Sequence, residues 1–175
     1  ATELSNLGRL RALVLSNNAF TGQIPPVIAS MPSLWKLNVS RNGLCGSIPE
    51  GINAGGTLRM LDLSGNCLSG PIPSSLFTLC DRLRYVDLSG NNLSGSLPAS
   101  LASCPRLEGL VFSDNSFDGP IPDAFTSLPL LHLLSLRHNR FSGTLPPSLT
   151  ECTSLNYLDL SMNLLEGSIS PSLVN

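Results

Sequence analysis

The chain alternates short segments of apolar and polar residues with segments that contain glycine and proline, and this pattern recurs along its length. In residues 83–106, Val86 and Leu88 fall on one side of an extended segment, with polar residues between and after them. Gly95 and Pro98 then interrupt any helix. A strand this short cannot bury its apolar side alone, whereas copies stacked side by side can. The pattern therefore predicts one short strand per copy in a repeat architecture.

The same pattern aligns six complete copies and parts of two more. The copy at 58–82 carries one extra residue, which we place around Cys80, Asp81 and Arg82. No linker or change of composition interrupts the register, so we expect one domain over residues 1–175. Its parts are the tail of a preceding repeat at 1–9, complete repeats at 10–33, 34–57, 58–82, 83–106, 107–130 and 131–154, and a partial repeat at 155–175, where Ser170 replaces the expected proline.

An asparagine recurs at the ninth position of each copy, where the strand leaves the sheet. A buried amide must be hydrogen-bonded, and these amides can bond the backbone of neighbouring turns. The inward leucines stack into a continuous core and contribute about 1.5–3 kcal/mol each. We therefore expect a structural ladder formed by Asn18, Asn42, Asn66, Asn91, Asn115, Asn139 and Asn163.

The outward-facing positions of the strands are the candidate recognition surface. Strand alternation leaves the third, fifth, seventh and eighth positions of each repeat on one face, and parallel strands about 4.8 Å apart align them in rows. Positions that vary between copies are where recognition can reside. The residues that we expect to contact a ligand or partner are Tyr85, Asp87, Val111, Asp114, Leu133, Ser135, Arg137, His138, Tyr157 and Asp159.

Two features of this face suggest specific chemistry. Asp62 and Asp87 are neighbours in one row at about 5 Å, the separation of a retaining glycosidase pair. The face is open to water, so we interpret them as a solvated, mildly repulsive pair. Arg137 interrupts a row of serines. The most basic local group is His132, Arg137, His138 and Arg140, whereas Trp35, at the second position of its repeat, is less clearly on the face.

Charge and composition exclude several classes of protein. Charged residues make up 13% of the chain and the net charge is −2. We find no basic stripe that would indicate nucleic acid or an anionic membrane as a partner. No apolar run approaches the roughly 20 residues of a membrane span. There is no initiator methionine, signal peptide or polar cap. We therefore expect a piece of a longer protein.

Cysteines and glycosylation sequons are the remaining candidate sites for covalent chemistry. Sequons begin at Asn38 and Asn92, and both could carry glycans in a secreted chain. Cys104 and Cys152 take the place of a core leucine, so we expect buried free thiols. Cys45 and Cys67 lie on adjacent repeats; a disulfide and a pair of free thiols are both open. Nothing in the sequence resembles a metal site, phosphate loop or nucleophile elbow, so we expect no metal, no cofactor and no enzyme.

The repeat is similar to the plant-specific class of leucine-rich repeats. The stretches LDLSGNCLSGPIP at 61–73 and VDLSGNNLSGSLP at 86–98 are close to the consensus of that class. The resemblance covers essentially every residue. It implies a right-handed solenoid with a parallel concave β-sheet and a convex side of 3₁₀ or short helical turns, such as 98–104. It also implies a second small sheet on the G-x-I-P segments.

The resemblance implies an extracellular binding module at the plasma membrane. Proteins of this class include ectodomains of plant receptor kinases, which recognise a peptide, a small molecule or a co-receptor through the concave face. Basic concave residues, such as Arg137 here, often receive the carboxyl terminus of a peptide in these receptors. Any kinase domain would lie outside the chain. The alternatives are a receptor-like protein without a kinase, a secreted inhibitor similar to those of polygalacturonases, or a structural wall protein.

Overall fold

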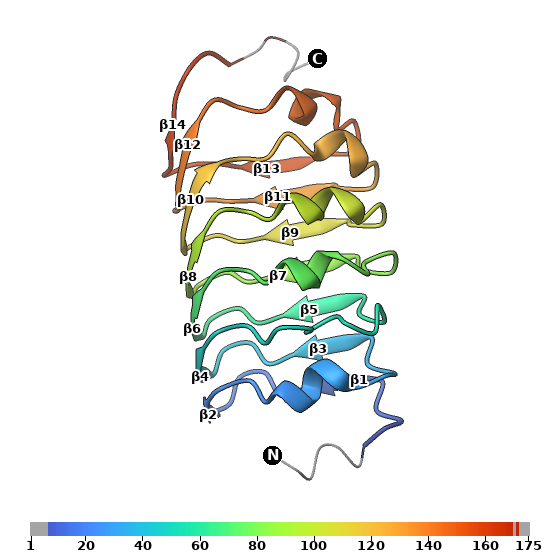
Figure 1. Ribbon diagram of the computed structural model, residues 1–175. Helices are drawn as coiled ribbons and strands as arrows, with labels where there is room; N and C mark the ends of the chain where they lie inside the picture. Colours follow the sequence, from blue (N-terminus) through green and yellow to red (C-terminus); the bar gives the residue numbers. More distant parts are fainter. Residues whose placement is uncertain (1–6, 170, 172–175) are drawn as a thin grey trace.

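The computed structural model describes residues 7–169 and 171, which form a stack of similar coils (Figure 1). Each coil contributes a strand to one sheet, turns into a strand of a second sheet and returns through a 3₁₀ helix or a turn. Most of the expected tail at 1–9, Ser170, and the end of the partial repeat at 155–175 lie outside the described residues.

The strands that the sequence predicts form one parallel sheet of seven strands within the described chain. Neighbouring strands pair in register, so that Tyr85 lies beside Met60 on one side and Gly109 on the other. The predicted repeat solenoid with a parallel sheet is thereby confirmed. The strands are β1 (Ala12–Val14), β3 (Lys36–Asn38), β5 (Met60–Asp62), β7 (Tyr85–Asp87), β9 (Gly109–Val111), β11 (Leu133–Ser135) and β13 (Tyr157–Asp159).

A second parallel sheet follows the asparagine of each repeat. We expected it on the G-x-I-P segments, and this was wrong by a few residues: β6 and β8 end at Gly70 and Gly95, before the Ile/Leu–Pro pairs. These glycines have φ of +81° and +80°, and proline has no N–H to donate, so the ladder stops there. The strands are β2 (Thr21–Gly22), β4 (Gly43–Gly46), β6 (Cys67–Gly70), β8 (Asn92–Gly95), β10 (Ser116–Pro120), β12 (Arg140–Gly143) and β14 (Leu164–Leu165).

The return segments contain 3₁₀ helices, as the sequence predicts, and these lie in front of the first sheet in Figure 1. They are η2 (Pro26–Ser30), η3 (Ser74–Phe77), η4 (Ala99–Ser103), η5 (Phe125–Ser127) and η6 (Pro147–Glu151). The repeat at 34–57 has turns over 50–55 in place of a helix. There the buried Asn53 donates hydrogen bonds to the carbonyls of Leu76 and Leu79, which the sequence analysis missed.

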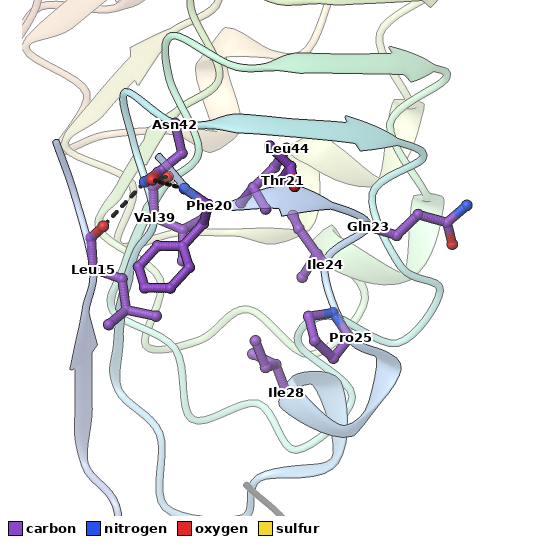
Figure 2. Close-up of a pocket in the computed structure, with 10 residues that line it drawn as sticks. All are labelled: Leu15, Phe20, Thr21, Gln23, Ile24, Pro25, Ile28, Val39, Asn42 and Leu44. Atoms are coloured by element: carbon purple, nitrogen blue, oxygen red, sulfur yellow. Dashed lines mark hydrogen bonds between the residues drawn. The ribbon is translucent and has the colours of Figure 1, made fainter. Parts of the chain in front are cut away.

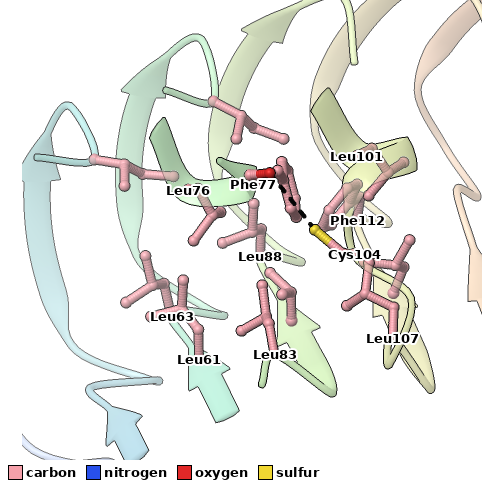
Figure 3. Packing of buried hydrophobic residues seen from close by; sticks show 14 of the residues in the cluster. Leu61, Leu63, Leu76, Phe77, Leu83, Leu88, Leu101, Cys104, Leu107 and Phe112 are labelled. Carbon is pink, nitrogen blue, oxygen red and sulfur yellow. Dashed lines mark hydrogen bonds between the residues drawn. The ribbon is translucent and has the colours of Figure 1, made fainter. Parts of the chain in front are cut away.

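The space between the sheets and helices is filled by one continuous apolar core. Central strand residues such as Leu61, Val86 and Leu110 are fully buried. Figure 3 shows how leucines from neighbouring coils pack in layers against Phe77 and Phe112. Because every layer contacts the next, each coil is stabilised by its neighbours rather than by its own short strand.

A disulfide joins two neighbouring return segments and corrects the cysteine assignment. Cys80 and Cys104 are bonded, so Cys104 is not the free thiol that we expected. The two occupy the same position in consecutive repeats, 24 residues apart. The extra residue of the third repeat therefore lies before Cys80, next to the end of η3 at Phe77, and not around 80–82. Cys152 is a buried free thiol, as expected.

The asparagine side chains link each coil to the one before it. The Asn91 amide donates to the carbonyls of Leu63, Leu88 and Ser89, while its oxygen accepts from the backbone N–H of Leu68. Asn42, Asn66, Asn115, Asn139 and Asn163 make the equivalent bonds. At Asn18, bonds reach the carbonyls of Leu15 and Ser16, within its own coil. The amides thereby satisfy backbone groups that leave the sheet.

Candidate functional site

The exposed face of the first sheet carries most of the residues that we expect to bind a ligand. The register aligns the third positions of the repeats in one row and the fifth positions in another. The third-position row contains Tyr85, Gly109, Leu133 and Tyr157 on adjacent strands. The structure therefore places aromatic and aliphatic side chains in one row at the start of the strands β7, β11 and β13.

The ring of Tyr85 lies across the next strand at Gly109. A methyl group on Gly109 would come within 2.5 Å of that ring, and its next neighbour would be Leu133, at 3.6 Å. Glycine at this position therefore makes room for the tyrosine. Two strands further along, Tyr157 leaves 51% of its surface exposed. Together Tyr85, Leu133 and Tyr157 form what we call the concave aromatic strip.

The fifth and seventh positions form hydrogen-bonded pairs at the ends of four strands. Asp87 Oδ1 accepts from the backbone N–H of Ser89 at 2.9 Å and from its hydroxyl at 2.6 Å. The same pairing occurs at Asp62–Ser64, Asp159–Ser161 and Asn38–Ser40. Four serines of the row are thus explained by local turn chemistry, because each closes the strand end onto the side chain two residues before it. Ser113 instead pairs with Ser135 of the next strand.

The pKa values of Asp87 and Tyr85, neighbours on β7, are shifted upward. Burial raises the pKa of Asp87 above its ordinary value; the hydrogen bonds from Ser89 oppose this, and the charge of Asp62 adds to it. Burial also raises the pKa of Tyr85, with the charges of Asp87 and Asp62 as further causes. The charges of Asp62 and Asp87 therefore act on the protonation of Tyr85, and the charge of Asp62 acts on that of Asp87.

The eighth position of the repeats adopts a left-handed backbone conformation. Asp114 and His138 have φ of 55° and 53°, and Gly65 and Gly90 occupy the same position in other repeats. His138 Nδ1 and Asp114 Oδ1 lie 2.8 Å apart across adjacent coils. Both side chains are more than half exposed, so this contact is available to a ligand and contributes little to stability by itself.

The structure divides the basic group that the sequence analysis picked out. Arg137 is exposed and its charge helps to lower the pKa of Asp159, behind the hydrogen bonds from Ser161. Arg140 instead belongs to β12 of the second sheet, and His132 lies just before β11. Arg137, His138, Asp114 and Asp159 thus remain a charged group beside the aromatic strip, whereas Arg140 lies on another side of the coil.

Two residues on the expected list are less available than the pattern suggested. Ser135 is 7% exposed, and its hydroxyl lies 2.6 Å from that of Ser113. Val111, beside it in the fifth-position row, is half-buried. Here the outward positions of two adjacent strands pack against each other, so the accessible part of the face is the aromatic strip and the charged group beside it.

The two sequons differ in accessibility. Asn38 is half-buried: its oxygen accepts from Ser40, and its amide donates to Asp62 Oδ2 at 2.9 Å. Asn92 is exposed at the start of β8 in the second sheet. The environment of Asn92 is the more favourable of the two for a glycan.

The strands β4 and β6 place Cys45 and Cys67 side by side as exposed free thiols. The hydrogen bond from Cys67 raises the pKa of the Cys45 thiol. The arrangement in this structure is the thiol pair rather than the disulfide.

An apolar hollow of about 200 Å³ opens at the first complete repeat (Figure 2). Leu15, Ile24 and Ile28 lie around it, and Asn42 at its edge is already bonded to the backbone at Phe20 and Leu15. With its polar groups satisfied, the hollow continues the apolar core and has no side chains suited to chemistry.

The described residues contain no group of three or more histidine, cysteine, aspartate or glutamate side chains suited to a metal ion. In the same part of the chain, no helix has both the length and the apolar character needed to cross a membrane.

The leucine-rich repeat family matches most of the chain. One match covers residues 81–141, and single repeats match at 9–31, 33–54, 57–79 and 154–175. The chain therefore belongs to the leucine-rich repeat family. No curated protein matches it in sequence.

Solved structures place the chain beside plant receptor ectodomains. The ectodomain of the Arabidopsis receptor kinase HAESA, solved with the peptide hormone IDA and the co-receptor SERK1, is 40% identical, with a TM-score of 0.92 over 98% of this chain. The receptor kinase GASSHO1/SCHENGEN3 from Arabidopsis thaliana, in complex with CASPARIAN STRIP INTEGRITY FACTOR 2, is 35% identical, with a TM-score of 0.93 over 97% of this chain. The chain spans 28% and 20% of these two ectodomain chains.

The same fold also occurs in a different class of protein. A plant ice-binding protein is 29% identical, with a TM-score of 0.74; the match covers 97% of this chain and 61% of that one. The solenoid alone therefore does not define a ligand, and the argument for function must rest on the exposed face.

Proposed function

We propose that this chain is part of the extracellular, ligand-binding region of a plant receptor kinase and that its concave face binds a peptide. The observation that supports this most directly is the concave aromatic strip of Tyr85, Leu133 and Tyr157 beside the charged group of Arg137, His138, Asp114 and Asp159. Exposed aromatic side chains anchor peptide and protein partners, and an exposed arginine can bind a carboxylate through two parallel hydrogen bonds.

The rigidity of the face favours this role. Its strands are fixed in register, and its turns are closed by hydrogen bonds between Asp or Asn and Ser, so a peptide would bind without ordering the receptor. The complex of the similar receptor kinase HAESA with the peptide hormone IDA supports the same ligand class. A co-receptor ectodomain is a further expected partner. The alternatives are a receptor-like protein, which would bind a ligand on the same face but lack a kinase, and a secreted inhibitor, which would bind a polygalacturonase there.

A selection from a library of secreted plant peptides on the immobilised chain tests the proposal. A selected peptide should lose about tenfold or more in affinity for the variants Tyr157→Ala and Arg137→Gln. Arg140→Gln, which removes another exposed arginine, from the second sheet, should leave the affinity within about twofold. Amidation of the peptide's C-terminus should weaken binding to the wild-type chain but not further weaken binding to Arg137→Gln. Selected peptides that bind all variants equally would contradict the proposal.

A further inference from the structure

A strip of arginines runs along the edge where the strands of the first sheet begin. Backbone hydrogen bonds from Trp35 to Arg11, from Arg59 to Trp35 and from Arg84 to Arg59 place these residues side by side, each directly before one of four adjacent strands. Adjacent strands lie about 4.8 Å apart, so the row spans roughly 15 Å. Arg82 precedes β7 in the same way that Arg106 precedes β9. The sequence analysis found no basic stripe because these arginines are dispersed through the sequence and only the fold brings them together.

Four of these arginines surround one hollow. Arg59, Arg82, Arg84 and Arg106 line an open space of about 270 Å³. Within the described part of the chain, the ion pair that involves them joins Arg84 to Glu108 at 2.9 Å. Four guanidinium groups thus line the hollow and one of them is paired with a carboxylate, which gives the hollow a net positive charge in a chain whose net charge is −2. Such a hollow attracts anions, and guanidinium groups bind carboxylates through paired hydrogen bonds.

A second, larger hollow adjoins the first and contains an aromatic ring. It has a volume of about 560 Å³ and shares Arg59 and Arg82 with the first, while Arg11, Trp35 and Thr57 complete much of its wall. Trp35 leaves 37% of its surface exposed. The Thr57 hydroxyl donates to the carbonyl of Leu34 and retains its capacity to accept a hydrogen bond. Its volume is in the range of sites for small ligands.

The two arginines that precede β7 and β9 are held by a covalent link. Leu83 N–H bonds to the Cys80 carbonyl and Leu107 N–H bonds to the Cys104 carbonyl, which closes the turns that carry Arg82 and Arg106. The Cys80–Cys104 disulfide joins these two turns. The spacing of the arginines is therefore largely fixed before any ligand binds, which reduces the entropic cost of binding.

We propose that these two hollows form a binding site for an acidic oligosaccharide, a chain of sugar rings that carries carboxylates. The arginines bind the carboxylates, the exposed face of Trp35 stacks on the apolar face of a sugar ring, and Thr57 accepts a hydrogen bond from a sugar hydroxyl. Charge alone would suit any anion. The flat aromatic ring beside hydroxyl groups, between arginines on both sides, favours a saccharide over an acidic peptide. This site is separate from the concave aromatic strip and does not depend on the proposed peptide binding.

Binding of a galacturonic acid octamer to the purified chain tests the inference. We expect measurable binding that weakens as salt rises, and an affinity at least about tenfold lower for the fully methyl-esterified octamer, which lacks the charges. Arg82→Gln/Arg106→Gln and Trp35→Ala should each lower the affinity about tenfold or more. Arg140→Gln should change it less than about twofold. Because Arg82, Arg106 and Arg140 are exposed, the arginine variants should keep the wild-type melting temperature. Trp35→Ala also removes buried surface and should melt lower, so its affinity is compared at a temperature where it is fully folded.

Several results would overturn the inference. Absence of octamer binding, or equal binding of the methyl ester, would exclude an acidic saccharide site. Equal affinity for polyglutamate of the same length would reduce the strip to a site for any polyanion. An equal loss in Arg140→Gln would show attraction without a defined site. The variants Tyr157→Ala and Arg137→Gln should bind the octamer as the wild type does, so a failure here is distinguishable from a failure of peptide binding.

Discussion

The amide of Asn38 donates a hydrogen bond of 2.9 Å to Asp62 in the next repeat, whereas the next pair in the same row consists of two carboxylates, Asp62 and Asp87. The same scaffold position thus carries an attractive contact between one pair of repeats and a repulsive contact between the next. Asn38 shows that asparagine fits the fifth position of the repeat, so replacing Asp87 by asparagine should remove the repulsion.

The variant Asp87→Asn should be more stable than the wild type at neutral pH. Asparagine keeps the oxygen that accepts from Ser89 and removes the charge that burial and Asp62 disfavour. The folded-state pKa of Asp87 is raised above its ordinary value of 3.8, so its stabilising contribution is complete below that value and is lost as the pH rises through the folded-state pKa. Melting temperatures should therefore be similar near about pH 3 and higher for the variant at about pH 7. A variant that melts lower at neutral pH would show that Asp87 is not destabilised by its charge.

The variant Asn91→Ala should be strongly destabilised. It loses four hydrogen bonds and leaves the backbone N–H of Leu68 without its acceptor, while the carbonyls of Leu63, Leu88 and Ser89 each keep one other donor. We expect a cost of about 1–3 kcal/mol. Asn18→Ala is the matched control, since its side chain is exposed and bonds only within its own coil, and it should cost less than about 1 kcal/mol. Urea unfolding measures both values. Equal costs for the two variants would contradict the ladder between coils.

Removal of the disulfide should lower stability without changing the fold. The bond closes a loop between residues 24 positions apart, and loops of this size contribute about 3 kcal/mol by constraining the unfolded chain. Cys80→Ala/Cys104→Ala, or reduction of the wild type, should lower the melting temperature while the circular dichroism at low temperature stays the same. Cys152→Ala is the control, because Cys152 is a free buried thiol. Reductant should lower the melting temperature of this variant by the same amount as that of the wild type. Insensitivity of the wild-type melt to reductant would refute the assignment.

Glycosylation should occur at Asn92 rather than Asn38. Asn92 is exposed, whereas a glycan on Asn38 would break its hydrogen bond to Asp62 and project over the concave face. Peptide mass spectrometry of the chain secreted from plant cells measures occupancy. Asn92→Gln should remove a glycan mass, and Asn38→Gln should leave the mass pattern unchanged. A glycan found at Asn38 would contradict the expectation and would also exclude a ligand from the second repeat.

The sequence was sufficient for the repeat architecture because the leucines and asparagines recur at constant spacing. Val86 and Leu88 could be assigned to the interior from alternation alone, and both are buried. The disulfide was also within reach: Cys80 and Cys104 each lie three residues before the first leucine of the next repeat. Equivalent positions of adjacent coils are neighbours in a solenoid, so this spacing was the signal that the analysis missed.

The binding surface was less predictable because alternation does not report how outward side chains pack on one another. Ser135 and Ser113 face each other and are buried, and the ring of Tyr85 covers Gly109. Arg82 and Arg106 lie in turns before β7 and β9, and the alternation within a strand does not predict where side chains in a turn point. These relationships depend on contacts between coils, and a pattern within one repeat cannot contain them.

Hydrogen–deuterium exchange of the chain with and without a peptide selected from the library tests the central claim most directly. If the concave face binds the peptide, protection should increase at the backbone amides near Tyr85, Leu133 and Tyr157 and around Arg137. Protection should change little in β12 of the second sheet and in the 3₁₀ helix η4. Increased protection confined to the second sheet, or to the 3₁₀ helices, would show that the peptide binds elsewhere and would contradict the claim that the first sheet is the recognition surface.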